Sequence, residues 1–484
     1  KNYIFISINM KIKQFLRSGR FSSVVLIDVI FLAISGITVL FMTWYKIGIE
    51  ADGYKYINYG KQLFEQGFYY FLSHDLEQFP VLYSIFFGLI YQLVWDIYLT
   101  AKILNILGLY LLIRYTFLLL KLKGLPQTVI FGVIIGLITS FPMLKTVSIV
   151  HTEPIFLGFF GLILYNVAKF DKHETLYNLW VAAFFLGVVT LIRYAGVFFI
   201  ISFCVFLITN IYTRKISLSN GIKAILLSIA LPFLYYVKNT FMVYNSNSFS
   251  FSIYETGLSR LLWLFDTILN WFSPWYYLSI CVFLLLVYVI LDKNVIGQWK
   301  FSLISIASYI IGLFAVITFL NNEVPFNDRI LLPVYFLIFV ISIWAVAKKF
   351  GNSYSYLLIL FFLSYSITNY NQILNIHQNS LLWSQRSITE SNVFEHHKLI
   401  NAEVVLSNFP YLLKTRTGID ARDTFYEKDF KNKPIKLDYS KDIAIVYFHA
   451  LPYRSYFMRP DEVVSKHQLS SVFRDEAATL ITNY

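Results

Sequence analysis

Residues 21–56 read FSSVVLIDVIFLAISGITVLFMTWYKIGIEADGYKY, an apolar run that gives way to a polar segment containing Asp52, Lys55 and Tyr56. The run 21–45 is long enough to cross the hydrocarbon core of a bilayer as a helix, which takes roughly 20 residues. It is also too long for the core of a cleaved signal peptide, so we expect a retained membrane anchor.

The composition of the whole chain extends this reading. Of the 484 residues, 57% are apolar, 19% are aromatic and 14% are charged, and the mean hydropathy is +0.60. So few charges cannot cover so much apolar surface in water, and the chain is predicted to be an all-α polytopic membrane protein. The net charge of +12 comes from short basic clusters between apolar runs, a pattern that indicates membrane topology and argues against a nucleic-acid partner. Cys204 and Cys281 lie inside apolar runs, so we expect no disulfide framework.

The apolar runs predict about eleven transmembrane helices. Their expected ranges are 21–45, 98–120, 127–143, 153–168, 177–192, 195–213, 222–242, 274–292, 301–320, 330–347 and 353–370. The run Val81–Trp95 is shorter than a span, so we expect it to lie in the outer interface, next to another juxtamembrane helix at 54–72. Basic residues precede the first span at Lys11, Lys13, Arg17 and Arg20, which predicts a cytoplasmic N-terminus. The later basic clusters are predicted to lie on the same cytoplasmic side, and they comprise Lys121, Lys123, Lys169, Lys172, Arg214, Lys215, Lys223, Lys293, Lys300, Lys348 and Lys349.

This topology divides the chain into two parts. Residues 1–370 form a transmembrane module whose first outer loop is 46–97, and residues 371–484 form a small extracytoplasmic α/β domain. Ile443–Phe448 (IAIVYF) is typical of a strand in that domain. The protein is therefore expected in the bacterial inner (plasma) membrane, with its C-terminal domain in the periplasm.

Polar residues then gather at the predicted outer ends of the helices. An unpaired charge next to an apolar run is costly, so several charges on one side indicate a function. Basic residues there run against the usual charge bias and favour a bound anion, of which a lipid phosphate fits best. Asp52 has the chemistry of a general base, although an Asp in this position is also typical of a helix cap.

Several short motifs in this order resemble one known family. The first outer loop contains the pattern Asp-x-x-basic-Tyr at 52–56 and Phe79-Pro80. Farther along are HTEP at 151–154, LIRYAG at 191–196, Tyr236-Val237-Lys238-Asn239, DRILLP at 328–333, and Ser407-Asn408-Phe409-Pro410 followed by Thr415-Arg416-Thr417-Gly418. Together they are similar to elements of the GT-C glycosyltransferases that use polyprenyl-phosphate sugars, such as protein O-mannosyltransferases and lipid A aminoarabinose transferases.

The resemblance implies a fold, a reaction and roles for residues. It implies an inverting transfer of a monosaccharide from a polyprenyl-phosphate donor to a hydroxyl of a glycan, lipid or protein acceptor, in contact with membrane lipids. The implied catalytic residues are Asp52 and Glu153, the phosphate-binding residues are Arg193, Lys238 and Arg329, and the other substrate-binding residues are Lys55, Tyr56, His151 and Tyr194. Because Gly53 stands where an acidic neighbour is frequent, no metal is expected, and no cofactor.

Other readings of the same residues stay open. Glu153 could pair with Lys145, Arg193 could reach phospholipid headgroups, and Arg329 could pair with Asp328. His151 has no second histidine at ligand spacing, which favours a structural role. Two other classes of protein share many helices with outer charges: polymerases or ligases of the O-antigen type, and lipid or sugar transporters (flippases). A transporter is expected to carry its polar residues near the middle of the bilayer.

Overall fold

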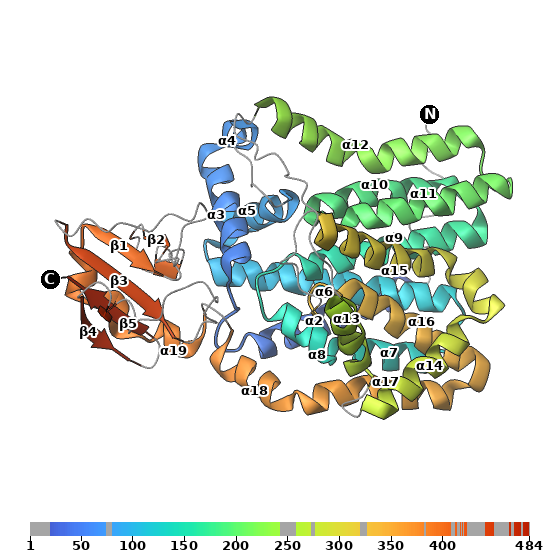
Figure 1. Ribbon diagram of the computed structural model, residues 1–484. Helices are drawn as coiled ribbons and strands as arrows, with labels where there is room; N and C mark the ends of the chain where they lie inside the picture. Colours follow the sequence, from blue (N-terminus) through green and yellow to red (C-terminus); the bar gives the residue numbers. More distant parts are fainter. Residues whose placement is uncertain are drawn as a thin grey trace. The chain divides into compact units, whose positions relative to one another are not determined.

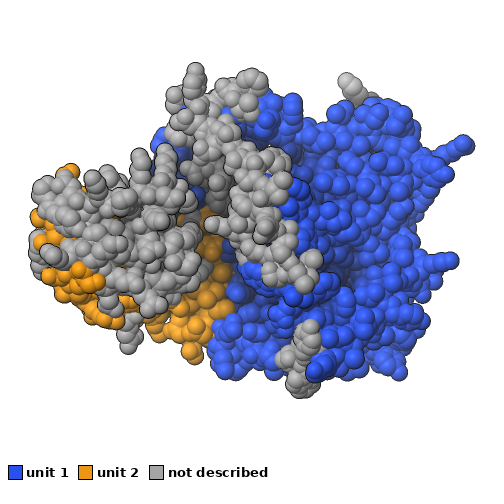
Figure 2. All heavy atoms as spheres, in the orientation of Figure 1, with its two compact units in different colours: residues 1–42, 55–147, 151–374 blue, residues 43–54, 148–150, 375–484 orange. Residues whose placement is uncertain are grey.

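The computed structural model describes residues 20–73, 80–242, 258–272, 276–319, 327–381, 384–407, 412–413, 417, 419, 421–423, 441–449, 464–465, 469–475 and 478–483. Several residues considered above lie outside this part of the chain: Lys11, Lys13, Arg17, Phe79, Asn408, Phe409, Pro410, Thr415, Arg416 and Gly418. The chain divides into two compact units (Figure 2). Unit 1 comprises Lys1–Met42, Lys55–Val147 and His151–Leu374, and unit 2 comprises Thr43–Tyr54, Ser148–Val150 and Asn375–Tyr484.

Unit 1 is a helical bundle (Figure 1). The helices of its first half are α2 (Arg20–Met42), α3 (Ala51–Gln66), α4 (Phe68–Ser73), α5 (Leu82–Val94), α6 (Ile97–Leu122), α7 (Gln127–Ile138), α8 (Phe141–Val147), α9 (Glu153–His173) and α10 (Leu176–Ile192). The second half contains α11 (Gly196–Tyr212), α12 (Leu218–Met242), α13 (Leu258–Asn270), α14 (Tyr276–Ile290), α15 (Lys293–Phe319), α16 (Leu332–Phe350), α17 (Asn352–Thr368) and α18 (Tyr370–Asn379). The first residues of α3 and the last residues of α18 are assigned to unit 2.

Helices α9 and α16 form the core of the bundle, and small residues let α9 approach its neighbour α6. A Cβ atom added at Gly108 of α6 would lie 2.4 Å from the backbone of Pro154, and one added at Gly158 would lie 2.7 Å from the carbonyl oxygen of Gly108. The two backbones are therefore in direct contact, the kind of packing that small residues allow between membrane helices. This contact fixes the start of α9, where Glu153 lies.

The outer helices keep large apolar side chains on the surface. Ile37 of α2 is 68% exposed, and Leu226 of α12 is 63% exposed. Such faces suit contact with lipid, because a helix satisfies its backbone hydrogen bonds internally. The chain is a multi-pass membrane protein, as its composition predicted.

A helix forms over each of the eleven expected ranges. In the described part of the chain, six helices are long and apolar enough to cross a membrane alone, namely α2, α6, α9, α12, α15 and α16. Two bent pairs, α7–α8 and α17–α18, raise this number to eight, while α10, α11 and α14 are shorter apolar helices. The count of eleven spans stays a prediction. Helix α5 has 13 residues and is about 20 Å long, short of the roughly 30 Å core of a bilayer.

The predicted cytoplasmic basic clusters come together at one end of unit 1. Lys123 Nζ donates a hydrogen bond to the carbonyl oxygen of Gln298, and Lys348 Nζ donates to that of Gly124 (3.0 Å). Lys215 pairs with Asp171 on α9 at 3.4 Å. We call this the basic end, defined by residues 121–126, 171–175, 213–217, 292–300 and 348–351. Its gathering agrees with the expected common side of these clusters.

Unit 2 contains a five-stranded sheet of order β2-β1-β3-β5-β4. Its elements are α19 (Arg386–Thr389), η1 (Asn392–Glu395), α20 (His397–Ile400), β1 (Val404–Ser407), β2 (Arg422–Asp423), β3 (Ile443–Phe448), β4 (Ser470–Arg474) and β5 (Ala478–Thr482). Strand β1 pairs in parallel with β2 and β3, and β5 pairs antiparallel with β3 and β4. The predicted strand Ile443–Phe448 is confirmed as β3, buried along its whole length at the centre of the sheet. This confirms the expected α/β domain.

Candidate functional site

Glu153 is the centre of a buried ion cluster in unit 1. Its carboxylate is 1% exposed and forms ion pairs with the guanidinium groups of Arg193 and Arg329, the latter at 2.8 Å from Nε to Oε1. The three residues are far apart in the sequence and come from the start of α9, the end of α10 and the turn before α16. A buried carboxylate is stable in this setting because two hydrogen-bonded cations compensate its charge.

The turn between α10 and α11 presents Arg193. Helix α10 ends there because Arg193 has an extended backbone, with φ −155° and ψ 127°. The amide of Gly196 then donates a hydrogen bond to the carbonyl oxygen of Arg193 at 2.8 Å. A Cβ atom added at Gly196 would lie 2.7 Å from the Cα of Thr190, so only glycine allows this close turn. The LIRYAG motif thus has a structural reason for its glycine.

The turn at residues 327–331 presents Arg329. Asp328 anchors this turn, because its carboxylate accepts hydrogen bonds from Trp271 Nε1 and from the hydroxyl of Tyr365, both at 2.9 Å. The hydroxyl of Tyr309 donates to the carbonyl oxygen of Ile330 at 2.7 Å. With the turn held on two sides, Arg329 pairs with Glu153, a partner that its sequence neighbours did not indicate.

The two arginines of the cluster share one carboxylate. Among the described residues, Glu153 forms ion pairs with both guanidinium groups. His151 precedes α9 and is fully buried; burial, with the charge of Arg329 beside it, holds the pKa of His151 well below its usual range, so the ring adds no charge at neutral pH. Arg193 is 15% exposed and Arg329 is 30% exposed. The guanidinium of Arg193 has five N–H donors, more than its pair with Glu153 uses, so it is able to bind an anion.

Tyr56 and Tyr83 extend the site toward the first outer loop. The two rings pack edge to face with centroids 5.2 Å apart, and both side chains are buried. The hydroxyl of Tyr83 lies within electrostatic reach of Glu153 and has no hydrogen-bond partner among the residues that the structure describes. A buried hydroxyl without a partner is costly, and such groups are found where a ligand supplies the missing bond. Nothing in the sequence marked Tyr83, which stands in an apolar run.

The other expected site residues lie on neighbouring elements. Lys238 is buried in α12, with Nζ 4.9 Å from the ring centroid of Phe71 on α4 and 5.1 Å from that of Tyr235. Lys55 lies on α3, and the ring of Tyr194 is 39% exposed in the turn after Arg193. The described contacts therefore place Lys238 against aromatic rings of α4 and α12.

Asp52 belongs to unit 2 and lies in the first turn of α3. A carboxylate in the first turn interacts favourably with the helix dipole. Asp52 lies inside α3, so its position differs from the helix cap considered above. The segment before Asp52 forms backbone hydrogen bonds with residues 148–150 of the same unit. The amide of Gly48 donates to the carbonyl oxygen of Ser148, and the amide of Val150 donates to the carbonyl oxygen of Gly48, both at 2.8 Å. Gly53 packs closely on Val150, since an added Cβ atom would lie 2.8 Å from its carbonyl oxygen. Within the described residues, no three His, Cys, Asp or Glu side chains form a group suited to a metal ion.

Comparisons with known proteins support this fold. No protein-family model and no curated protein matches the chain. The helical bundle and the C-terminal α/β sheet nevertheless define a polytopic membrane protein with a GT-C-like fold. The particular likeness is to ArnT from Cupriavidus metallidurans: its structure bound to undecaprenyl phosphate has a TM-score of 0.59 and 12% identity, covering 94% of this chain and 98% of that chain. Its apo-state structure has a TM-score of 0.55 and 11% identity, covering 96% and 99%.

Proposed function

We propose that this protein is an integral-membrane glycosyltransferase that moves a monosaccharide from a polyprenyl-phosphate donor to an acceptor hydroxyl on the outer face of the membrane, with inversion. The observation that carries this proposal is the buried Glu153–Arg193–Arg329 cluster, in which two guanidinium groups share one carboxylate. A structure with the same fold holds undecaprenyl phosphate, which supports a donor of this class. The arrangement of polar residues near one end of the bundle favours this function over transport.

The proposed roles follow from the chemistry of the transfer. The acceptor oxygen attacks the anomeric carbon, its proton passes to the Asp52 carboxylate, and the bond from that carbon to the phosphate oxygen breaks. The departing phosphate gains negative charge, and guanidinium groups already in place stabilise it without rearrangement. We assign this task to Arg193 and Arg329, with Lys238 as a further cation.

Glu153 serves this scheme as a positioning residue. Its carboxylate is occupied by two arginines, which leaves it poorly suited to take a proton and well suited to orient both guanidinium groups. Tyr56, Tyr83, His151, Lys55 and Tyr194 are assigned to the surroundings of the sugar and acceptor. Glu153, which the resemblance places among the catalytic residues, is thus assigned an orienting role.

Binding of the donor lipid tests the phosphate site. Arg193→Lys keeps the charge but loses the planar two-pronged donor, so its affinity for undecaprenyl phosphate should fall by about tenfold or more. The matched control is Arg114→Lys, because Arg114 also pairs with a carboxylate, that of Asp28 at 3.1 Å, in a different part of the bundle. Wild-type affinity in purified Arg193→Lys would remove Arg193 from the phosphate site.

Transfer itself is tested in cells. A deletion strain complemented with Asp52→Asn should lack the glycan product in mass spectra of the cell envelope, while the purified variant should still bind undecaprenyl phosphate. The control is Asp442→Asn, an exposed aspartate of the same unit. If Asp52→Asn restores the product as fully as the wild type does, Asp52 is not the base.

A further inference from the structure

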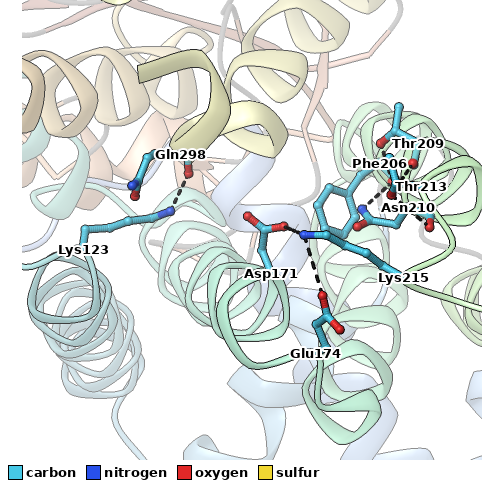
Figure 3. Close-up of polar contacts among 9 residues, drawn as sticks. All are labelled: Lys123, Asp171, Glu174, Phe206, Thr209, Asn210, Thr213, Lys215 and Gln298. Carbon is cyan, nitrogen blue, oxygen red and sulfur yellow. Dashed lines mark hydrogen bonds and ion pairs between the residues drawn. The ribbon is translucent and has the colours of Figure 1, made fainter. Parts of the chain in front are cut away.

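The basic end of unit 1 contains a cavity that the proposed transfer does not use. Its volume is about 290 Å³, and it lies between α6, α9, α11 and the start of α15. A wider hollow of about 620 Å³ adjoins it and shares Lys123, Asp171 and Gln298 (Figure 3). Glu153 begins α9 and Asp171 lies near its end, so about 27 Å of helix separates this cavity from the ion cluster.

The lining of the cavity is amphipathic. The inner wall consists of apolar side chains from the facing helices, namely Leu119, Leu164, Val167, Phe206 and Phe301. The rim of the two hollows has lysines at positions 123, 172, 215, 293 and 300. An apolar wall under a cationic rim is the arrangement expected for a ligand with an anionic head and an apolar body.

Positive charge exceeds negative charge around this rim. The described lining of the two hollows contains five lysines and one carboxylate, that of Asp171. Lys215 pairs with Asp171 at 3.4 Å and with Glu174, which lies outside the lining, at 4.0 Å. Lys123 is the innermost example: its Nζ donates to the carbonyl oxygen of Gln298 and lies 5.3 Å from the ring centroid of Trp299. Burial lowers the pKa of Lys123 to about 8 even though Asp171 opposes this shift, which means that nearby carboxylates compensate its charge incompletely.

Several other polar groups of the cavity have partners, whereas Trp299 Nε1, which also lines it, has none among the described residues. The Asn210 amide and the Thr209 hydroxyl both donate to the carbonyl oxygen of Phe206, at 2.8 Å, and the Thr213 hydroxyl donates to that of Thr209 at 3.0 Å (Figure 3). The ammonium groups of the lysines, with three donors each, are therefore the main donors left for a ligand.

We propose that this cavity binds the phosphate-bearing headgroup of an anionic membrane phospholipid, with Lys123 and Lys215 contacting the phosphate and the apolar wall contacting the glycerol and upper acyl chains. Basic pockets between membrane helices are recognition sites for such headgroups. The apolar wall is the reason to choose a lipid over a free phosphate ion, which has no apolar part to bury. This site does not depend on the glycosyltransferase proposal.

Native mass spectrometry of the delipidated full-length protein tests the proposal. Dioleoyl phosphatidylglycerol should bind more tightly than dioleoyl phosphatidylcholine, whose headgroup carries no net charge. The double variant Lys123→Gln/Lys215→Gln should bind phosphatidylglycerol about 25-fold more weakly, or about fivefold for each lysine removed near the surface. The charge-preserving pair Lys123→Arg/Lys215→Arg should retain binding, which separates loss of charge from misfolding.

Lys121→Gln is the matched control, since Lys121 is an exposed lysine of the same end that does not line the cavity. Three results would overturn the proposal: equal affinity for the two lipids, unchanged affinity in the double glutamine variant, or a loss in Lys121→Gln as large as in that variant. Displacement of phosphatidylglycerol by an equal concentration of inorganic phosphate would identify a free anion as the ligand and reject the lipid.

Discussion

Replacing Glu153 with glutamine should destabilise the protein more than any other change of a single charge in unit 1. The substitution keeps the size of the side chain and leaves two guanidinium groups facing a neutral amide. Removing one partner of a buried ion pair costs about 3–5 kcal/mol. The lower end of that range applies here, because Arg193 and Arg329 are 15% and 30% exposed and can regain some hydration.

This cost converts into a change in melting temperature. The entropy of unfolding is roughly 2 cal/mol/K per residue, or about 1 kcal/mol/K for a chain of this length, so a loss of about 3 kcal/mol lowers the midpoint by about 3 °C. The measurement is size-exclusion chromatography of the purified protein after heating in detergent. Glu65→Gln is the control, because Glu65 is exposed on α3 and its replacement should change the midpoint by less than about 0.5 °C.

A second substitution tests the electrostatic reason directly. In Glu153→Gln/Arg193→Gln the unpaired charge at position 193 is gone, so the loss should be smaller than the sum of the two single losses, by about 1–3 kcal/mol. Additive losses, or a Glu153→Gln protein that melts with the Glu65→Gln control, would show that the cluster does not stabilise the bundle.

Three further predictions use the same melting assay. Gly196→Ala should lower the free energy of unfolding by more than about 2 kcal/mol, because the new Cβ atom would lie 2.7 Å from the Thr190 backbone. Gly36→Ala is the control and should be tolerated, since the space around Gly36 is open. Equal melting midpoints of the two variants would contradict the packing argument. Tyr365→Phe removes a hydrogen bond to Asp328 and should lower the free energy of unfolding by about 1.5–3 kcal/mol. Tyr354→Phe, at an exposed position, should leave it almost unchanged. Equal stability of the two variants would show that the hydrogen bond is not formed. The pKa of buried His151 is lowered in the folded protein, so below about pH 6.5 the unfolded chain binds a proton that the folded chain does not. The free energy of unfolding should therefore fall as the pH drops from 6.5, by up to about 1.4 kcal/mol per pH unit. His151→Asn should flatten this part of the stability profile, and an unchanged slope would exclude His151 as its source.

The sequence alone determined the features that depend on neighbouring residues. Apolar runs of bilayer length predicted helices at every expected range, and the basic residues between them predicted the common end at which Lys123, Lys215 and Lys348 now meet. The strand Ile443–Phe448 could be predicted for the same reason, since a continuous run of apolar and β-branched residues suits a strand buried on both faces. The motifs around Glu153, Arg193 and Arg329 also predicted the three parts of the ion cluster.

Only the tertiary structure decided how those parts combine. Helix packing brings residues 153, 193 and 329 together and selects Glu153 as the partner of both arginines, where the sequence left Lys145 and Asp328 as alternatives. Helix packing also places the buried hydroxyl of Tyr83 near Glu153 and the ammonium group of Lys238 against the ring of Phe71. These pairings depend on close contacts between helix backbones, such as that of Gly108 with Pro154. Such contacts set the distance and rotation of one helix relative to its neighbour. The strength of an ion pair varies with the distance and burial of its atoms, and neither quantity is encoded by spacing along the chain.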